Sequence, residues 1–218
     1  TSQATPGLGW GAGPWNRGTW GTPRSIATSG ISLESRLWSL DLWGEDLIIN
    51  VRNGKVYRWD ASTGPGTRAA QIPNTTDRVR FIRISSPDLH LVLFGSEPDG
   101  GGDQDPMLIL WSDRGDYEVY TPTATNDAGD KRLGIGTKLV GVILTRDTFM
   151  VSTDGAIYSM VFQGPPYTFA FKLISATASA AMISQNAGCD FFGTGYYMGK
   201  DGFYRYNGSV ARIPCPVE

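Results

Sequence analysis

The sequence has little of the chemistry that marks most enzymes and metal sites. Among its 218 residues there is one histidine, His90, and it lies between two leucines in an expected strand. A Ser-His-Asp triad or a histidine-rich metal site would have to be built around this residue alone. The motifs GxxxxGKS/T, GxSxG and HExxH are also missing. We therefore expect His90 to be a structural residue, and the protein to be neither an enzyme nor dependent on a cofactor.

Cysteine is also scarce. Cys189 and Cys215 fit neither a CxxC metal site nor the dense disulfide framework of small secreted proteins. The favoured interpretation is a pair of buried free thiols, because free cysteine behaves as a small apolar residue. A single disulfide between the two is the open alternative.

An excess of basic charge and long apolar runs are lacking as well. The chain has 19 Lys and Arg against 21 Asp and Glu, a formal net charge of −2, so a broad basic surface for duplex nucleic acid is not expected. No apolar run approaches the ~20 residues that a membrane-spanning helix needs. The first residues do not show the basic-then-apolar pattern of a signal peptide.

What the sequence has in quantity is turn-forming and aromatic residues. Glycine (28) and proline (13) are dispersed along the chain rather than periodic, and so they mark many turns. Seven Trp, nine Tyr and nine Phe favour strands and can supply a core. No segment shows the 3.6-residue period of an amphipathic helix. An all-β fold is therefore predicted.

One short pattern, a turn followed by a strand with an aromatic residue, occurs three times. The turns are Asn53-Gly54, Asp154-Gly155 and Asp201-Gly202. Such pairs favour two-residue type I′ hairpin turns, because Asn, Asp and Gly tolerate a positive φ at both central positions. The first two glycines are 101 residues apart, about two periods, and the last two are 47 apart. A period of about 40 to 50 residues built from hairpins is typical of one four-stranded β-propeller blade.

Around these turns the chain divides into four strand-rich units. The units cover about residues 31–73, 77–122, 137–175 and 180–214. We expect Tyr117–Tyr120 as the outer strand of the second unit, residues 123–136 as a surface loop, and Ala181–Ser184 as the first strand of the fourth unit. The prediction is a β-propeller-like domain over residues 31–218 with about four antiparallel blades. A closed four-bladed ring and an arc of a larger ring both fit this number.

Residues 1–30 differ from the rest and are expected to form an extended arm rich in glycine and tryptophan. Trp10, Trp15 and Trp20 are spaced five residues apart among glycines, which disfavour helices and regular strands. Large aromatic rings on such an arm need a surface that covers them. They either pack on their own domain or contact a neighbouring subunit.

Three arginines form one candidate binding surface. Arg78, Arg80 and Arg83 belong to one alternating strand and are expected on a single face. If this face lines a channel, it could meet a phosphate backbone. The plainer alternative is a solvent-exposed face or a set of ion pairs.

An acidic loop is the one candidate for a metal ion. Asp99, Asp103 and Asp105 are separated by glycines, and three carboxylates on such a loop could hold Ca²⁺. The spacing does not match the twelve-residue EF-hand loop, so a solvated acidic loop is favoured.

Several segments resemble a family of phage virion proteins. They are the glycine-tryptophan segment Gly9–Gly21 with Thr22-Pro23-Arg24, the stretch Leu40–Asp60, and the ending Asp201–Gly208 with Ile213-Pro214-Cys215-Pro216. These resemble the tail nozzle, or tail tubular, proteins of short-tailed bacteriophages, and the second stretch is similar to their first propeller blade. The resemblance implies a six-fold ring with a central passage for DNA. Because chains of that family continue well past this point, it also implies that these 218 residues are a fragment.

The resemblance further implies a location and partners. The location is the virion, in the phage tail. The partners are other copies of the chain in a ring, expected to be a hexamer, together with the adaptor and portal-side proteins and the tail fibres. Viral DNA would pass through transiently, and a host surface receptor is a further candidate partner. No catalytic residue is implied.

The function predicted from the sequence is therefore structural: a tail subunit that forms part of the DNA ejection conduit. The alternative is a receptor- or glycan-binding β-propeller, in which Trp and Tyr rings stack on sugars. A propeller hydrolase with Asp and Glu at a channel mouth is the third hypothesis, because fold alone does not exclude it. The shortage of histidine and of catalytic motifs disfavours that third hypothesis.

Overall fold

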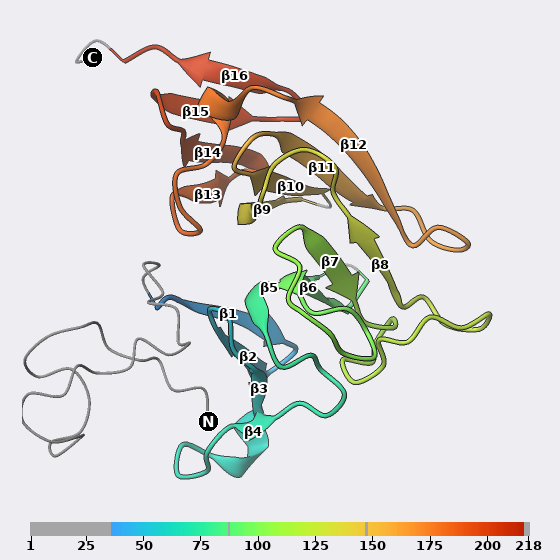
Figure 1. Ribbon diagram of the computed structural model, residues 1–218. Coiled ribbons are helices and arrows are strands. Elements are labelled where there is room, and N and C mark those ends of the chain that lie inside the picture. Colours follow the sequence, from blue (N-terminus) through green and yellow to red (C-terminus); the bar gives the residue numbers. More distant parts are fainter. Residues whose placement is uncertain (1–35, 87, 147, 216–218) are drawn as a thin grey trace, which may run out of the picture. The chain divides into compact units, whose positions relative to one another are not determined.

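The chain divides into two units, Thr1–Leu37 and Trp38–Glu218, and all the described strands belong to the second. The structure, a computed structural model, describes residues 36–86, 88–146 and 148–215 (Figure 1). These residues form sixteen strands and two short 3-10 turns, η1 (Ala61–Thr63) and η2 (Ala178–Ala180). None of them forms a helix long and apolar enough to cross a membrane.

Four antiparallel sheets follow one another along the described part of the second unit, and within each sheet the strands are neighbours in sequence order. Sheet 1 consists of β1 (Trp38–Trp43), β2 (Asp46–Val51), β3 (Val56–Trp59) and β4 (Ala70–Gln71). Sheet 2 consists of β5 (Val79–Ser85), β6 (His90–Ser96), β7 (Leu108–Trp111) and β8 (Gly129–Arg132). Sheet 3 consists of β9 (Leu139–Thr145), β10 (Thr148–Thr153), β11 (Ile157–Phe162) and β12 (Phe169–Ser175). Sheet 4 consists of β13 (Gly188–Phe191), β14 (Thr194–Met198), β15 (Phe203–Tyr206) and β16 (Val210–Ile213).

The first strands of the sheets lie next to one another. β1 contacts β5, β5 contacts β9, and β9 contacts β13. Sequential four-stranded meanders with neighbouring first strands are the arrangement of β-propeller blades. The predicted fold class, all-β with propeller-like repeats of four-stranded antiparallel sheets, is therefore confirmed.

Apolar side chains fill the space between each sheet and the next. The cluster between sheets 1 and 2 includes Ile48, Val56, Ile82, Ile84 and Leu93. The cluster between sheets 2 and 3 includes Phe81, Phe94, Phe149, Val151 and Met160. The cluster between sheets 3 and 4 includes Ile143, Met150, Ile157, Tyr197 and Tyr206. Sheets 2 and 3 are therefore covered on both faces, whereas sheets 1 and 4 each have one face outside these clusters.

Polar side chains join the edge of β5 to sheet 1. The Ile82 N–H donates to Ser39 Oγ over 3.1 Å, and the Ile84 N–H donates to Asp41 Oδ2 over 2.8 Å. β5 is the edge strand of its sheet, so these two N–H groups need a partner outside the ladder. Short polar side chains of β1 therefore replace the backbone partner that an inner strand would have.

The predicted outer strand of the second unit is wrong. Tyr117–Tyr120 is not a strand; Tyr117 packs edge-on against Trp43, with ring centroids 5.3 Å apart, and Tyr120 is buried between sheets 1 and 2. The outer strand is β8, inside the segment expected to be a surface loop. Its sequence, Gly-Asp-Lys-Arg, has no apolar alternation, because it pairs on one side only and three of its four residues are exposed.

The expected first strand of the fourth unit is also wrong. Ala181–Ser184 is not a strand: Met182 makes only an isolated bridge to Gly199, and its N–H donates to Ser152 Oγ of sheet 3 over 3.0 Å. Ala181 and Met182 are buried, Met182 in the cluster between sheets 3 and 4, whereas Ile183 is 47% exposed. Sheet 4 instead begins with β13.

Both described cysteines are free, but neither is buried, so the expectation of buried thiols is wrong. Cys189 on β13 is exposed and Cys215 is partly exposed. Cys189 belongs to the face of sheet 4 that no other described sheet covers.

Candidate functional site

The first repeat turn is not the expected type I′ turn. The Gly54 N–H donates to the Val51 carbonyl over 2.9 Å, so the central residues are Arg52 and Asn53. Of these two only Asn53 has a positive φ, 57°, which is the pattern of a type II turn. Gly54 has a different role, since a Cβ there would lie 2.6 Å from Val51 Cγ1.

The other two repeat turns also differ from the expected type. Asp154-Gly155 has no positive φ, and in Asp201-Gly202 only the glycine does, at 150°. A two-residue hairpin turn with positive φ at both central residues is instead formed by Phe192-Gly193, at 49° and 77°, between β13 and β14. All three repeat pairs nevertheless lie between the second and third strands of their sheets, and each precedes a strand, as the repeat predicted.

Asp154 connects the turn of sheet 3 to the segments around it. Its carboxylate accepts hydrogen bonds from the Thr137 N–H over 2.7 Å and from the Lys138 N–H over 3.4 Å. Burial raises the pKa of Asp154, but the hydrogen bonds from Thr137 and Lys138 outweigh it and hold the pKa below its ordinary value. The Asp154 carbonyl accepts from Lys200 Nζ of sheet 4 over 2.8 Å.

The turn of sheet 1 connects to sheet 2 in a similar way. The Asn53 N–H donates to the Val79 carbonyl over 2.8 Å, and Val79 N–H donates to the Gly54 carbonyl over 3.1 Å. Asn53 Oδ1 accepts from Gln104 Nε2 over 3.1 Å. The repeat turns of sheets 1 and 3 are therefore joints between neighbouring sheets.

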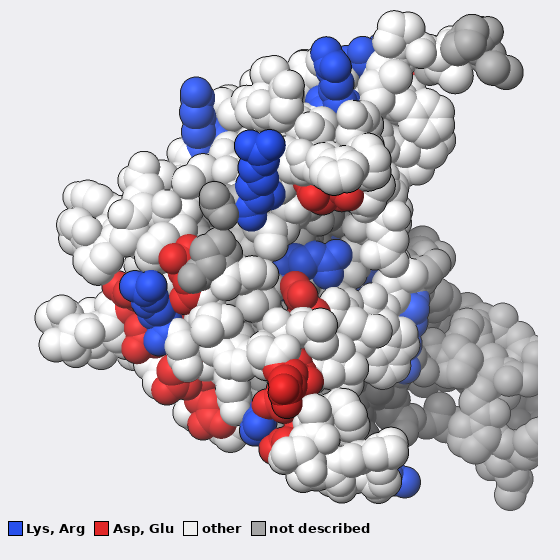
Figure 2. Space-filling view, turned by 180° about the vertical axis from the view of Figure 1, so that it is seen from behind, with Lys and Arg blue, Asp and Glu red and all other residues white. Residues whose placement is uncertain are grey.

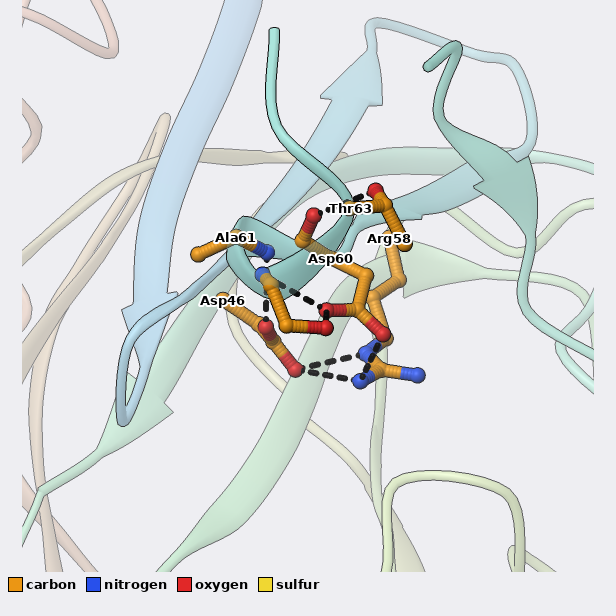
Figure 3. A network of polar contacts seen from close by, with 6 residues as sticks. Asp46, Arg58, Asp60, Ala61 and Thr63 are labelled. Carbon is orange, nitrogen blue, oxygen red and sulfur yellow. Dashed lines mark hydrogen bonds and ion pairs between the residues drawn. The ribbon is translucent and has the colours of Figure 1, made fainter.

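A compact polar network stabilises the end of sheet 1 (Figure 3). Arg58 Nε donates to Asp46 Oδ2 over 2.7 Å, and Arg58 also pairs with Asp60 over 3.2 Å. The hydrogen bond to Asp46 raises the pKa of Arg58, and hydrogen bonds from Ser62 lower the pKa of Asp60. The guanidinium also lies 5.5 Å from the centre of the Tyr117 ring. These groups satisfy one another, so the network is structural.

The three arginines do not form the single face that the sequence predicted. Arg78 is exposed and pairs with Glu97 over 3.3 Å, whereas Arg80 is 8% exposed. Arg83 is partly buried and donates to the Ile82 carbonyl over 3.5 Å. The reason is that side chains of a strand alternate between its two faces, so Arg80 and Arg83, three positions apart on β5, point to opposite faces, and both faces are covered, by sheets 1 and 3. Contact of any one of these arginines with phosphate stays a prediction.

One carboxylate of the acidic loop, that of Asp105, forms an ion pair with Arg132. Asp105 Oδ2 accepts from Arg132 Nε over 2.6 Å, and its other oxygen accepts from the Met107 N–H over 2.9 Å. Asp99 and Asp103 lie among glycines with φ values of 86°, 95° and 139°. Among residues 36–86, 88–146 and 148–215, no group of three or more His, Cys, Asp and Glu is placed to hold a metal ion.

His90 is fully buried, in agreement with its predicted structural role. Its Nδ1 lies 2.8 Å from the Ser112 carbonyl, and its ring contacts those of Phe162 and Phe169, each at a centroid distance of 5.4 Å.

Sheet 1 has an exposed apolar surface on the face that points away from sheet 2. Cross-strand partners share a face, and the pairs here are Trp38↔Val51, Leu40↔Ile49, Leu42↔Leu47, Ile49↔Tyr57 and Leu47↔Trp59. These eight side chains are apolar or aromatic, and the pair Tyr57↔Gln71 adds the polar Gln71 of β4 to the same face. The three on β1 are 57%, 53% and 61% exposed. We name this set the open face of sheet 1.

Sheet 4 has a matching surface on the side away from sheet 3. The registers place on it Cys189, Phe191, Thr194, Tyr196, Met198, Phe203, Arg205, Ala211 and Ile213. Its largest side chains are exposed, among them Phe191 (62%), Met198 (43%) and Phe203 (45%). The opposite face carries the buried Tyr197, Tyr204 and Tyr206. We name the first set the open face of sheet 4.

A groove with aromatic walls lies between the outer strands β8 and β12. Its volume is about 470 Å³, and its lining includes Trp111, Lys131, Tyr167 and Phe171. The Tyr167 side chain is 76% exposed. A flat ring beside a cation is suited to a polar ring ligand such as a sugar.

Charge is divided unevenly along the strand-bearing unit. Residues 38–132 hold ten Lys and Arg against fifteen Asp and Glu, a formal net charge of −5, whereas residues 133–215 hold six against four, +2. Figure 2 shows most of the Asp and Glu side chains in the lower half of that view. Sheets 1 and 2 therefore carry the acidic half of the unit.

Trp10, Trp15 and Trp20, the predicted subunit contacts, lie outside the described residues. The open faces were not among the sites predicted from the sequence. Their signal was present as the alternation Trp38, Leu40, Leu42 in β1, but alternation alone does not tell which face another sheet covers.

Comparison with known proteins adds a limited structural likeness. No protein-family model matches the chain, and no curated protein matches its sequence. A crystal structure of Kluyvelomyces marxianus Hsv2 is similar at a TM-score of 0.39 and 9% identity, over 81% of this chain and 44% of that one. The likeness thus covers less than half of that protein's chain. At this TM-score, the fold assignment depends on the four sheets and their order.

Proposed function

We propose that this chain is a structural subunit that assembles through its sheets and forms part of a bacteriophage tail tube. The observation that carries the proposal is the pair of open apolar faces on sheets 1 and 4. Flat apolar surfaces of this kind are sites of contact with other protein surfaces. The blade-like sheets provide a rigid support for such contacts, since three apolar clusters and side-chain hydrogen bonds join them.

The tail role is supported by the resemblance of Leu40–Asp60 and Asp201–Gly208 to tail nozzle proteins of short-tailed phages. In this role, copies form a ring, expected to be a hexamer, that meets adaptor or portal-side proteins and tail fibres. The acidic charge of residues 38–132 suits a conduit, because a strongly basic wall would hold the duplex during ejection.

Negative-stain electron microscopy of the purified protein tests this proposal. We expect rings with a central hole, formed by the protein alone or after addition of a neighbouring tail protein. Particles that stay single under both conditions would contradict it. A ring whose lumen is strongly electropositive along its length would contradict the conduit role in particular.

The aromatic groove supports one alternative, a glycan-binding module. Tyr167 is exposed at the groove, and Phe171 and Lys131 contribute to the same lining. Sugar rings stack on aromatic side chains such as these, and a neighbouring polar group orients the sugar. Binding on a glycan array that disappears in the Tyr167→Ala variant would favour this function. Binding that is absent, or unchanged in the variant, would count against it.

A further inference from the structure

The three contacts between sheets follow one rule: each sheet meets the preceding sheet with one face and the following sheet with the other. Sheet 2 uses the face with Ile82 and Leu93 to cover sheet 1, and the opposite face with Phe81 and Phe94 to meet sheet 3. Sheet 3 likewise meets sheet 2 with one face and sheet 4 with the other. Each sheet therefore has one face for its predecessor and one for its successor.

The two open faces are the faces at the start and the end of this series of sheets, which no described sheet covers. The open face of sheet 1 is the side on which a preceding sheet would lie, and the open face of sheet 4 is the side for a following sheet. Both have a mainly apolar composition: the first is apolar or aromatic on β1, β2 and β3, with Gln71 of β4 as its polar residue, and the second has Arg205 as its one charged residue. Each is thus suited to the other.

We propose that a second copy of this chain covers these faces, with the open face of sheet 4 of one copy packed on the open face of sheet 1 of the next. This inference rests on the proposed function, because it requires copies of the chain to associate. The contact is head to tail, so it repeats from copy to copy and closes into a ring when the rotation permits. It joins the same two kinds of face as the three contacts within the chain, but a ring of six copies needs a different rotation at this contact, because propellers close at about four to eight blades.

The division of charge supports this direction of contact. Head-to-tail packing brings the end of the +2 half, residues 133–215, to the end of the −5 half, residues 38–132. A contact between two sheet 1 faces would instead bring two acidic halves together, which like-charge repulsion disfavours.

Single substitutions on the two faces test the contact. In sedimentation velocity of the 218-residue chain, Leu40→Lys and Phe203→Lys should each weaken self-association by at least about tenfold, because each places a charge in an apolar contact. Leu173→Lys is the matched control, since Leu173 is 44% exposed and belongs to neither open face. Circular dichroism checks that each variant is folded, and Leu42→Lys and Met198→Lys replace any variant that is not.

Mixing the variants distinguishes head-to-tail contact from contact between identical faces. Leu40→Lys keeps its sheet 4 face and Phe203→Lys keeps its sheet 1 face, so an equimolar mixture should form a pair while each variant alone stays monomeric. If contacts joined identical faces, each variant alone would still pair through its unaltered face. That result would overturn the head-to-tail contact.

The thiol of Cys189 gives an independent readout without any substitution. Cys189 is exposed on the open face of sheet 4, whereas Cys215 follows the last strand. We expect alkylation of Cys189 by N-ethylmaleimide to slow as protein concentration rises, with Cys215 as the internal control. Assemblies that form with Cys189 fully reactive and survive both face substitutions would overturn this inference and leave only the tail-tube role of the proposed function standing. A chain that neither associates nor forms rings would contradict both.

Discussion

At the residue scale, one sequence signature serves three different local structures. Asn53 takes a left-handed conformation, Asp154 has no positive φ, and Asp201 accepts a hydrogen bond from the Tyr204 hydroxyl. The sequence predicts that a turn occurs at each position, because Asn, Asp and Gly disfavour a continuing strand. It does not predict the turn type, because the bonds that select it come from residues distant in the chain, such as Val79 and Lys200.

Residue 54 has no room for a side chain, because the turn brings the Val51 side chain close to its Cα. The Gly54→Ala variant should lose about 1–3 kcal/mol of unfolding free energy, because the new Cβ would lie 2.6 Å from Val51 Cγ1. Gly66→Ala is the control, since nothing lies within 4 Å of a Cβ there. Urea unfolding measures both, and an equal effect at the two positions would refute the steric explanation.

Asp154 should contribute measurably to stability at neutral pH. Removal of its charge in Asp154→Asn weakens the hydrogen bonds from Thr137 and Lys138, and we expect a loss of about 1 kcal/mol because the carboxylate is partly in contact with water. Asp99→Asn, on the exposed acidic loop, is the control. Urea unfolding at pH 7 checks the difference.

The contribution of Asp154 should also depend on pH in a defined direction. Its pKa is lowered in the folded state, so the stabilisation is fully present above the unfolded-state pKa of about 3.9 and is lost as the pH falls through the folded-state pKa. The difference in unfolding free energy between wild type and Asp154→Asn should be constant from about pH 7 to 5 and shrink below about pH 4. A difference that grows on acidification would show that the pKa of Asp154 is raised, not lowered, in the folded state.

At the scale of elements, the sequence identifies strands that have an apolar face and misses those without one. β5 and β6 have buried faces, and both lie where the sequence predicted strands, around Arg80 and around His90. β8 was missed because its four residues carry no apolar alternation, and its pairing with β7 depends on a distant strand. Tyr117–Tyr120 shows the converse error, in which a loop buries aromatic side chains through contacts with another sheet.

The edge of β5 depends on a side chain from β1. In Asp41→Ala, the Ile84 N–H loses its acceptor, and we expect a loss of about 1–3 kcal/mol of stability, since a buried donor is left unsatisfied. Hydrogen exchange of the Ile84 amide should become faster, with Glu45→Ala in the neighbouring exposed turn as the control. Unchanged exchange at Ile84 would mean that another group holds this edge.

At the scale of the whole molecule, the number of sheets and their order along the chain were predictable, because hairpin turns recur with a period near that of one blade. The contacts between sheets were not, since a strand pattern does not tell which face another sheet covers. The open faces of sheets 1 and 4 were found only from the registers and the exposure of their side chains.

The acidic charge of residues 38–132 should keep the protein from holding duplex DNA. We expect no retardation of a DNA duplex at about 10 µM protein and physiological salt, where non-specific binders are typically at their dissociation constants. Neutralisation of Asp99 and Asp103 to Asn should increase any weak binding. Tight binding by the wild-type chain would contradict the role of a passive conduit.

The central claim is that this chain assembles through its open sheet faces, and sedimentation velocity of the wild-type protein over a range of concentrations tests it most directly. The account predicts a mass that rises from the 23.6 kDa of one chain to at least two copies as the concentration increases. A mass of one chain at every concentration, with Leu40 and Phe203 still accessible, would contradict it.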